Sequence, residues 1–162
     1  MAAVDYFLKF DGIKGESTDA KHKEELDIES WSWGEMQAGA AGPRGGGAGA
    51  GKVSMQDFHF VMRANKASPA LMKACATGQH IKLATLTARK AGKDQQEFLT
   101  IKFQDVLVSS FQTGGSEGAD LPIDQVSLNF AKIEVEYKQQ KPDGTLVPGD
   151  KFGFDVKANK TL

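Results

Sequence analysis

Apolar and polar residues alternate along most of this chain, which is the pattern of half-buried β-strands. In the first run, Val4, Tyr6, Leu8 and Phe10 alternate with a mostly polar set. A change of apolar parity between Ile28 and Trp31 indicates either a bulge or a strand buried on different faces at its two ends. A similar change predicts a bulge near Phe130. Strands are expected at residues 4–10, 26–33, 53–62, 81–90, 97–111, 123–137 and 152–156.

One segment has the pattern of a short helix instead. Ser68 is suited to the N-cap, Pro69 to the first helical position and Gly78 to the C-terminal stop, while apolar residues recur at i, i+3 and i+4 from Leu71. We therefore expect a mainly β fold over a single domain, 1–162. It should be a β-barrel or two-sheet sandwich of about seven strands, with one short α-helix (Ser68–Gly78) and a long Gly-rich extended loop.

That loop is the segment Gly39–Gly51, in which seven of thirteen residues are glycine and four are alanine. It has almost no side chain to bury, so it cannot carry a core. Residues 46–52 come close to the phosphate-binding pattern G-x-x-x-x-G-K-[ST], but Val53 stands where a magnesium-binding hydroxyl is needed. A strand-like run follows where that motif requires a helix. A contact loop is therefore favoured over a nucleotide site.

Composition and charge argue against several further classes of protein. The chain has 162 residues, 40% hydrophobic and 25% charged, with a net charge of −1, so no overall field favours nucleic acid or an acidic membrane. A single cysteine, Cys75, excludes an intramolecular disulfide. The N-terminus lacks the basic start of a signal peptide, and no apolar run approaches the roughly 20 residues of a membrane span.

Several patterns resemble catalytic or metal sites without their context. Residues 114–118 match G-x-S-x-G, but Pro122 and a strand follow where a nucleophile elbow needs a helix. The histidines His22, His59 and His80 have no metal-ligand spacing. Cys75 lies on the apolar helix face and is interpreted as a core residue. We therefore expect no enzymatic activity, no metal and no cofactor, and favour a binding or assembly protein.

Three further interpretations concern surfaces. The charged run 21–25 is interpreted as a solvated connection. Trp31 and Trp33 are interpreted as core residues, which places Ser32 on the opposite face. Residues 53–62 carry apolar groups on both faces, which suggests burial on both sides, with another subunit as one possible partner.

The order of several segments resembles the Hcp family, the haemolysin-coregulated tube proteins of type VI secretion. Residues 7–17 (FLKFDGIKGES) are followed by 28–34 (IESWSWG), the glycine-rich loop and the helix 68–78 (SPALMKACATG). Later segments, VLVSS at 106–110, TGGS at 113–116, LNFA at 128–131 and VEY at 135–137, also match family positions. The resemblance covers essentially the whole chain.

The resemblance implies a structural subunit that forms a homohexameric ring, with rings stacked into a tube that is expelled and carries effectors in its lumen. It implies partners: a spike (VgrG-like) protein, the sheath and baseplate, and small effector proteins. It implies passage from the bacterial cytoplasm to the extracellular space or a target cell without a signal peptide. The chain ends soon after its last strand, so we expect the form without a C-terminal effector extension.

The resemblance also assigns roles to residues. The ring-to-ring contact falls on the loop, and Ser32 becomes the candidate for contact with effectors on the lumen wall. A monomeric β-sandwich ligand-binding module remains the alternative. The stacking residues are Gly39, Gly42, Pro43, Arg44, Gly45, Gly46, Gly47, Gly49, Gly51 and Lys52, and the structural motif residues are Gly15, Glu16, Ser17, Trp31, Trp33 and Gly34.

Overall fold

The computed structural model describes residues 4–37, 52–91 and 95–162, and over these residues the protein is mainly β with one helix, which confirms the predicted fold class. The predicted stacking loop, residues 39–51, lies outside the described residues. The elements are β1 (Val4–Phe10), β2 (Leu26–Ile28), β3 (Ser30–Ser32), β4 (Glu35–Gln37), β5 (Val53–Met55), β6 (Phe58–Arg63), α1 (Ser68–Thr77), β7 (His80–Lys90), β8 (Glu97–Gly114), β9 (Ile123–Asn129), β10 (Lys132–Gln140), β11 (Leu146–Asp155) and β12 (Lys160–Thr161).

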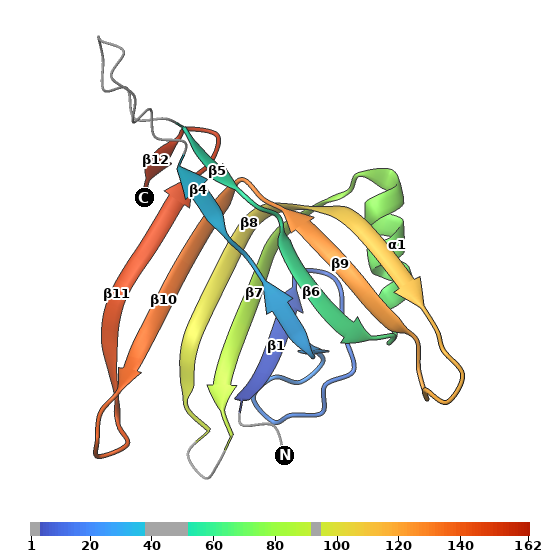
Figure 1. Ribbon diagram of the computed structural model, residues 1–162, viewed down its shortest axis with the longest axis horizontal. Helices are drawn as coiled ribbons and strands as arrows, with labels where there is room; N and C mark the ends of the chain where they lie inside the picture. The colour runs from blue at the N-terminus through green and yellow to red at the C-terminus, as the bar shows by residue number, and fades with distance from the viewer. Residues whose placement is uncertain (1–3, 38–51, 92–94) are drawn as a thin grey trace.

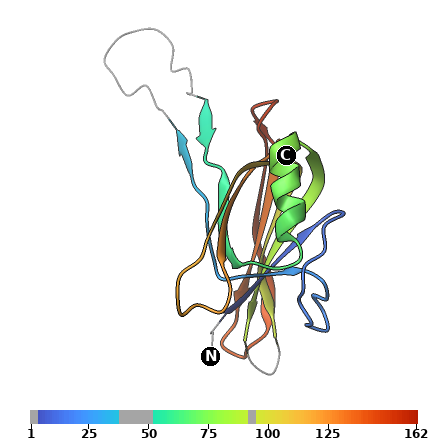
Figure 2. The same ribbon diagram turned by 90° about the vertical axis from the view of Figure 1, so that its right-hand side faces the viewer.

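A large antiparallel sheet forms one layer, in the order β12-β11-β10-β8-β7-β1-β2 (Figure 1). The second layer consists of β3, β6 and β9, which pair in that order, and β9 pairs with the C-terminal part of β8. Figure 2 shows these layers lying face to face. Over the described strands the path is open, so the fold is a sandwich and not a closed barrel.

The sheet divides into layers where β8 bends. The first part of β8 pairs with β10 up to Gln104, and its last part pairs with β9 from Leu107 onward. Between them Asp105 has a φ of 55°, a left-handed conformation that interrupts the ladder. Phe130 and Ala131 separate β9 from β10 at the same level. The single strand predicted at 123–137 is therefore two strands in different layers.

The predicted parity change after Ile28 has the same cause. β2 pairs with β1 in the first layer, and β3 pairs with β6 in the second. The sequence left two alternatives for residues 26–33, a bulge or a strand buried on different faces at its two ends. The second alternative is correct. The strand predicted at 53–62 is also divided, because β5 leaves the second layer to pair with β4 in a separate two-stranded ribbon.

Aromatic side chains fill the space between the layers. Phe58 and Phe60 of β6 are fully buried, and the Phe58 ring lies 4.7 Å from that of Phe103 in β8. Trp31 stacks on Phe58 at 5.9 Å. Trp31 and Trp33 are only partly buried and pack against the core, so they are core-edge residues and not central ones.

Helix α1 confirms the predicted helix, but its N-terminus differs from the prediction. Ala67 is the N-cap, and no side chain caps the helix. Ser68 is already helical, and its buried hydroxyl donates to Asp124 in β9 at 2.6 Å. The reason is tertiary: Asp124 is fully buried and needs a donor. Gly78 ends the helix with a φ of 68°, as predicted.

Candidate functional site

The register of the second layer determines which way Ser32 faces. Trp31 lies opposite Phe60, and Phe60 opposite Val126, so these side chains share the core face. Ser32 lies opposite His59, which lies opposite Ser127. Ser32 is exposed on the other face, as the alternation predicted.

The exposed face of the second layer carries mainly polar side chains, and we call it the polar face. His59 Nδ1 and Ser127 Oγ lie 3.1 Å apart across β6 and β9, and the row continues onto the last part of β8. Most of these side chains are hydroxyl and amide groups, which bind water well, and charge enters where Arg63 of β6 pairs with Glu29 at 2.9 Å. The residues of this face include Ser32, His59, Val61, Arg63, Ser110, Gln112, Gln125 and Ser127.

Gly15, Glu16 and Ser17 belong to a loop that folds back on itself. Gly15 N donates to the carbonyl of Glu24 at 2.7 Å, and Ser17 N donates to that of Glu25 at 3.0 Å. A Cβ on Gly15 would lie 2.5 Å from the Glu25 carbonyl oxygen, so this approach requires glycine. Glu16 lines a hollow of about 270 Å³.

The run 21–25, interpreted from sequence as solvated, is packed against the first layer. His22 is buried and its ring stacks on Phe7 at 4.3 Å. Its two ring nitrogens lie 2.9 Å from a carboxylate oxygen of Glu25 and 2.7 Å from one of Glu97. The solvated interpretation is therefore wrong for His22 and for the half-buried Glu25, whereas Lys21, Lys23 and Glu24 are exposed as expected.

A buried ion pair anchors the same loop. Arg89 in β7 is 2% exposed, and its guanidinium bonds to Asp19 and Asp5. The hydrogen bond from Arg89 and a backbone bond from Lys21 hold the pKa of Asp19 far below its usual range. Burial, with Asp5 and Asp19 nearby, raises the pKa of Asp27.

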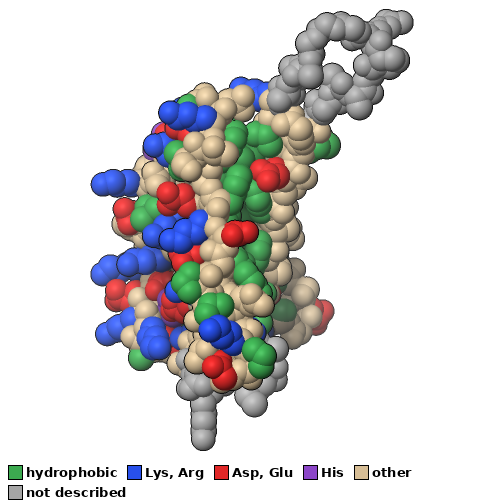
Figure 3. Space-filling view, turned by 90° about the vertical axis from the view of Figure 1, so that its left-hand side faces the viewer, with side chains coloured by type: hydrophobic (Ala, Val, Ile, Leu, Met, Phe, Trp, Pro, Cys, Tyr) green, Lys and Arg blue, Asp and Glu red, His purple; other side chains and the backbone are tan. Residues whose placement is uncertain are grey.

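A second surface lies where the first layer extends past the second. We call this part, made of β10, β11 and the first half of β8, the wing. Its core-side face carries an apolar stripe that the second layer leaves partly open, and Figure 3 shows apolar side chains running along this flank beside rows of charge. Tyr137 is 51% exposed. The apolar stripe contains Leu99, Val135, Tyr137, Phe152 and Phe154.

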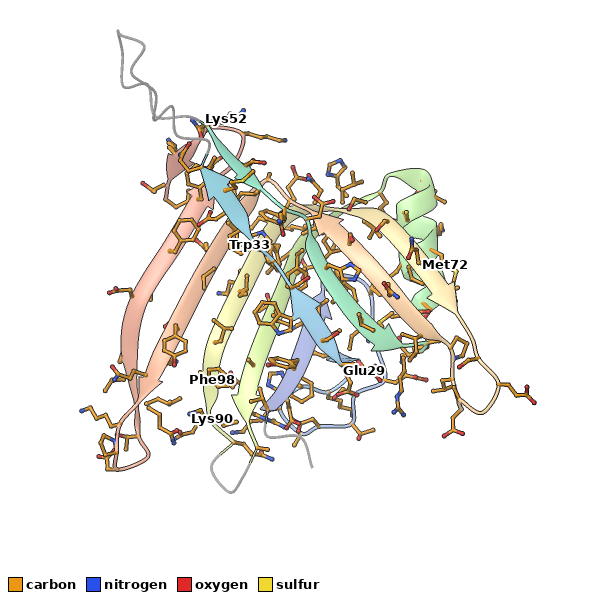
Figure 4. The ribbon with its side chains drawn as sticks, viewed as in Figure 1. Glu29, Trp33, Lys52, Met72, Lys90 and Phe98 are labelled. Atoms are coloured by element: carbon orange, nitrogen blue, oxygen red, sulfur yellow. The ribbon has the colours of Figure 1, made fainter. Side chains whose placement is uncertain are left out.

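The β4–β5 ribbon marks one end of the molecule. Gly34 accepts a hydrogen bond from Gln56 N at 2.9 Å where the ribbon leaves the body. Figure 4 shows Lys52 at the tip of the described ribbon, far from Glu29 and Lys90 in the lower part of the view. Lys52 is exposed, and Met36 is 67% exposed. The described strands of the ribbon, β4 and β5, thus end away from the core.

The sequence patterns that resemble catalytic, nucleotide or metal sites do not lie in the structural surroundings that such sites require. Gly114 ends β8, and no helix occurs between it and β9. Lys52 is followed by a strand, unlike a phosphate-binding lysine. His80 binds Asp105, which Lys157 also approaches, in an exposed ion-pair group. His22, His59 and His80 bond to different partners, and among the described residues no group of three potential metal ligands occurs.

Comparison with known proteins identifies the family. Residues 7–137 match the family model described as "Type VI secretion system effector, Hcp". The chain belongs to the Hcp family of type VI secretion. It is 48% identical to protein hcp1 of Pseudomonas aeruginosa over 97% of this chain and 98% of that protein. No helix in the described part is long and apolar enough to cross a membrane.

Solved structures agree with this Hcp assignment. Hcp1 from Salmonella typhimurium is 34% identical with a TM-score of 0.79, covering 99% of this chain and all of that one. A structure described as a type six secretion system protein superposes with a TM-score of 0.92 at 28% identity, over 99% and 100% of the two chains. The resemblance stated from sequence is confirmed.

Sequence reasoning missed two groups of residues. The Arg89–Asp19 and His22 contacts join segments 70 and 75 residues apart, and no local pattern reveals such pairs. The apolar stripe was visible in the sequence as an alternating pattern, because one non-apolar residue separates Val135 from Tyr137 and another separates Phe152 from Phe154. The sequence could not show that the second layer would fail to cover them.

Proposed function

We propose that this Hcp protein is the structural subunit of the type VI inner tube. Six copies form a ring, rings stack into a tube, and the tube is expelled with effectors in its lumen. Its partners in this role are the spike protein at the tip, the surrounding sheath and the baseplate. It leaves the bacterial cytoplasm through the secretion apparatus.

The observation that carries the proposal is the open apolar stripe on the wing. Burial of such a surface is favourable in water, by a free energy of about 25 cal/mol for each Å² of apolar area that is covered. Exposed contiguous apolar patches on soluble proteins are typical of interaction sites. A ring copy would cover the stripe with its neighbour, and this burial would stabilise the assembly.

The two remaining surfaces fit the same role. Apart from the Arg63–Glu29 pair, the polar face presents hydroxyl and amide groups to whatever occupies the lumen, so it can contact many effectors with little selection by charge. The ribbon projects at one end, where the next ring would lie. We propose contact with effectors for Ser32 and ring stacking for Lys52 and the loop residues 39–51.

The test is the mass of the purified protein by light scattering on a sizing column, with negative-stain images of the peak. We expect six chains per particle and ring-shaped images. A single species of one chain at micromolar concentration would contradict the proposal. It would instead favour the monomeric binding module, for which a ligand screen by thermal stabilisation would follow.

A further inference from the structure

We propose that Asp57 is the positioning residue of the β4–β5 ribbon, because its hydrogen bonds fix the direction in which the ribbon leaves the body. The inference rests on the proposed stacking of rings, since β4 and β5 flank in sequence the loop assigned to that contact. Asp57 itself lies at the base of the ribbon, outside the residues proposed for stacking.

Both strands of the ribbon bend where they join the body. Trp33 and Gly34 separate β3 from β4. Gln56 and Asp57 separate β5 from β6, and we call these four residues the elbow. Figure 2 shows the ribbon standing away from the two layers. Among the described strands, β4 and β5 pair only with each other. A two-stranded hairpin is marginally stable by itself, so the direction of the ribbon depends on contacts at the elbow.

Asp57 is held by two other strands through both of its carboxylate oxygens. The Ser109 hydroxyl of β8 donates to Oδ2 at 2.6 Å, and the side-chain amide of Asn129, the last residue of β9, donates to Oδ1 at 3.1 Å. The Asp57 side chain is half-buried. Hydrogen bonds are directional, so two of them on one carboxylate fix its orientation as well as its position.

A bulge in β8 supplies one of these two donors. Val108 lies opposite Leu128 and Ser110 lies opposite Ser127, so Ser109 is an extra residue without a partner in β9. Ser109 and Ser110 are neighbours in the chain, and yet both are exposed. A bulge can re-aim a side chain. Here the extra residue brings a hydroxyl within hydrogen-bond distance of the elbow.

The other contacts of the elbow hold the ribbon without aiming it. Gln56 N donates to the Gly34 carbonyl at 2.9 Å, and this bond joins the two strands of the ribbon to each other. Trp33 and Met55 pack partly buried against the core, and such apolar contacts are non-directional. The bonds of Asp57 therefore supply the directional anchor among the described residues. A ribbon that is already aimed in the free ring loses less freedom on docking, which favours stacking.

The distance between two spin labels in one chain tests this role. Cys75 is the single cysteine, so Cys75→Ser gives a background in which Ser54→Cys labels the ribbon and Lys102→Cys labels β8. Both labelled positions are exposed. Co-expression with an excess of the cysteine-free chain ensures that each distance is read within one chain. We expect a narrow distance distribution in the parent protein. In Asp57→Ala the population outside this range should rise about tenfold, because two bonds to a carboxylate are lost.

An exchange of partners tests the hydrogen bonds themselves. Asn129→Asp places a second carboxylate against that of Asp57, so the distribution should widen. Addition of Asp57→Asn restores one carboxylate and one amide in reversed positions, and the Ser109 hydroxyl can donate to either. The double variant should therefore be as narrow as the parent. Asp143→Ala is the matched control and should change nothing, because Asp143 also accepts two hydrogen bonds, from Thr145, but lies in the turn between β10 and β11.

The outcomes separate this inference from the proposed tube. A monomer by light scattering contradicts the ring, whereas the distances within one chain still test Asp57. Equal distributions in the parent and Asp57→Ala overturn the positioning role, and so does an exchange variant that stays as wide as Asn129→Asp. If Asp57→Ala fails to fold, Ser109→Ala and Asn129→Ala each remove one bond and take its place.

Tube formation then tests the link between direction and stacking. Rings of Asp57→Ala should keep the mass and the thermal unfolding midpoint of the parent but form fewer tubes in the presence of the spike or sheath. Asp57→Asn/Asn129→Asp rings should form tubes as the parent does. Equal tube formation by Asp57→Ala rings would overturn the inference, because stacking would then not depend on the direction of the ribbon.

Discussion

Arg89 in β7 holds Asp19 with two parallel hydrogen bonds, Nη1 to Oδ1 at 3.0 Å and Nη2 to Oδ2 at 2.7 Å. The guanidinium also lies 4.9 Å from the centre of the Phe7 ring. A strand in the first layer thus fixes the loop that runs from β1 to β2. Such two-pronged geometry is specific to arginine, because a lysine presents a single ammonium group.

We predict that Asp19→Asn destabilises the folded protein by about 2 kcal/mol at pH 7, because a hydrogen bond to a charged group is lost beside a buried arginine. Arg89→Lys should cost a similar amount, since one ammonium cannot make both bonds. Urea unfolding measures both. The exposed pair Arg63–Glu29 supplies the control, and Glu29→Gln should change stability by less than about 1 kcal/mol.

The same pair predicts a dependence on pH. The folded pKa of Asp19 is lowered below its usual value of 3.8, so its contribution is complete above that value and is lost as the pH falls through the acid range. The parent protein should therefore lose more stability between pH 5 and pH 3 than Asp19→Asn does. Equal losses in the two proteins would show that Asp19 keeps its ordinary pKa.

Gly15 and Gly115 make a matched pair for a second prediction. A Cβ at Gly15 would meet the Glu25 carbonyl, whereas nothing lies within 4 Å of one at Gly115. Gly15→Ala should therefore destabilise the protein by about 1–3 kcal/mol through backbone displacement. Gly115→Ala should change stability by less than about 0.5 kcal/mol. Thermal unfolding of both variants measures the difference, and equal stabilities would contradict the close approach at Gly15.

Local patterns predicted much of this fold because their causes are local. The alternation from Val4 to Phe10 predicted β1, although Phe7 on its other face is also buried. Gly78 ends α1 as predicted because its backbone can adopt a positive φ. Ser68 shows the limit: its sequence neighbours indicate a cap, but Asp124, 56 residues away, takes its hydroxyl. His22 was misinterpreted for the same reason, because its environment comes from Phe7 and Glu97.

One part of the candidate site could be predicted from local sequence, and another part could not. The facing of Ser32 followed from its place between two tryptophans, since adjacent residues on a strand point to opposite faces. The apolar stripe depends on which strands the second layer covers, and this is decided by the bend at Asp105. A turn of that kind in a long apolar strand leaves no pattern in the neighbouring residues.

Deletion of residues 42–49 is predicted to separate stacking from ring formation. The wing and its apolar stripe remain intact in this variant, so rings should form with unchanged mass. The ribbon would lose most of the segment proposed to contact the next ring. Ordering backbone costs about 1–2 kcal/mol per residue, so we expect stacking to need nucleation by the spike or sheath. Electron microscopy of secreting cells or of nucleated tubes should show rings without tubes, and loss of the rings would contradict this division of roles.

Ser32→Gln is predicted to weaken retention of effectors without affecting assembly. Ser32 is exposed beside His59 on the polar face, so a longer amide fits on the free protein but projects into the lumen of a ring. Ring mass and thermal stability should therefore equal those of the parent protein. If the ring protects effectors inside it, their level in the producing cell should fall. Met36→Gln is the matched control, because Met36 is also exposed but lies on the ribbon. Unchanged effector levels in Ser32→Gln rings would remove Ser32 from the lumen wall.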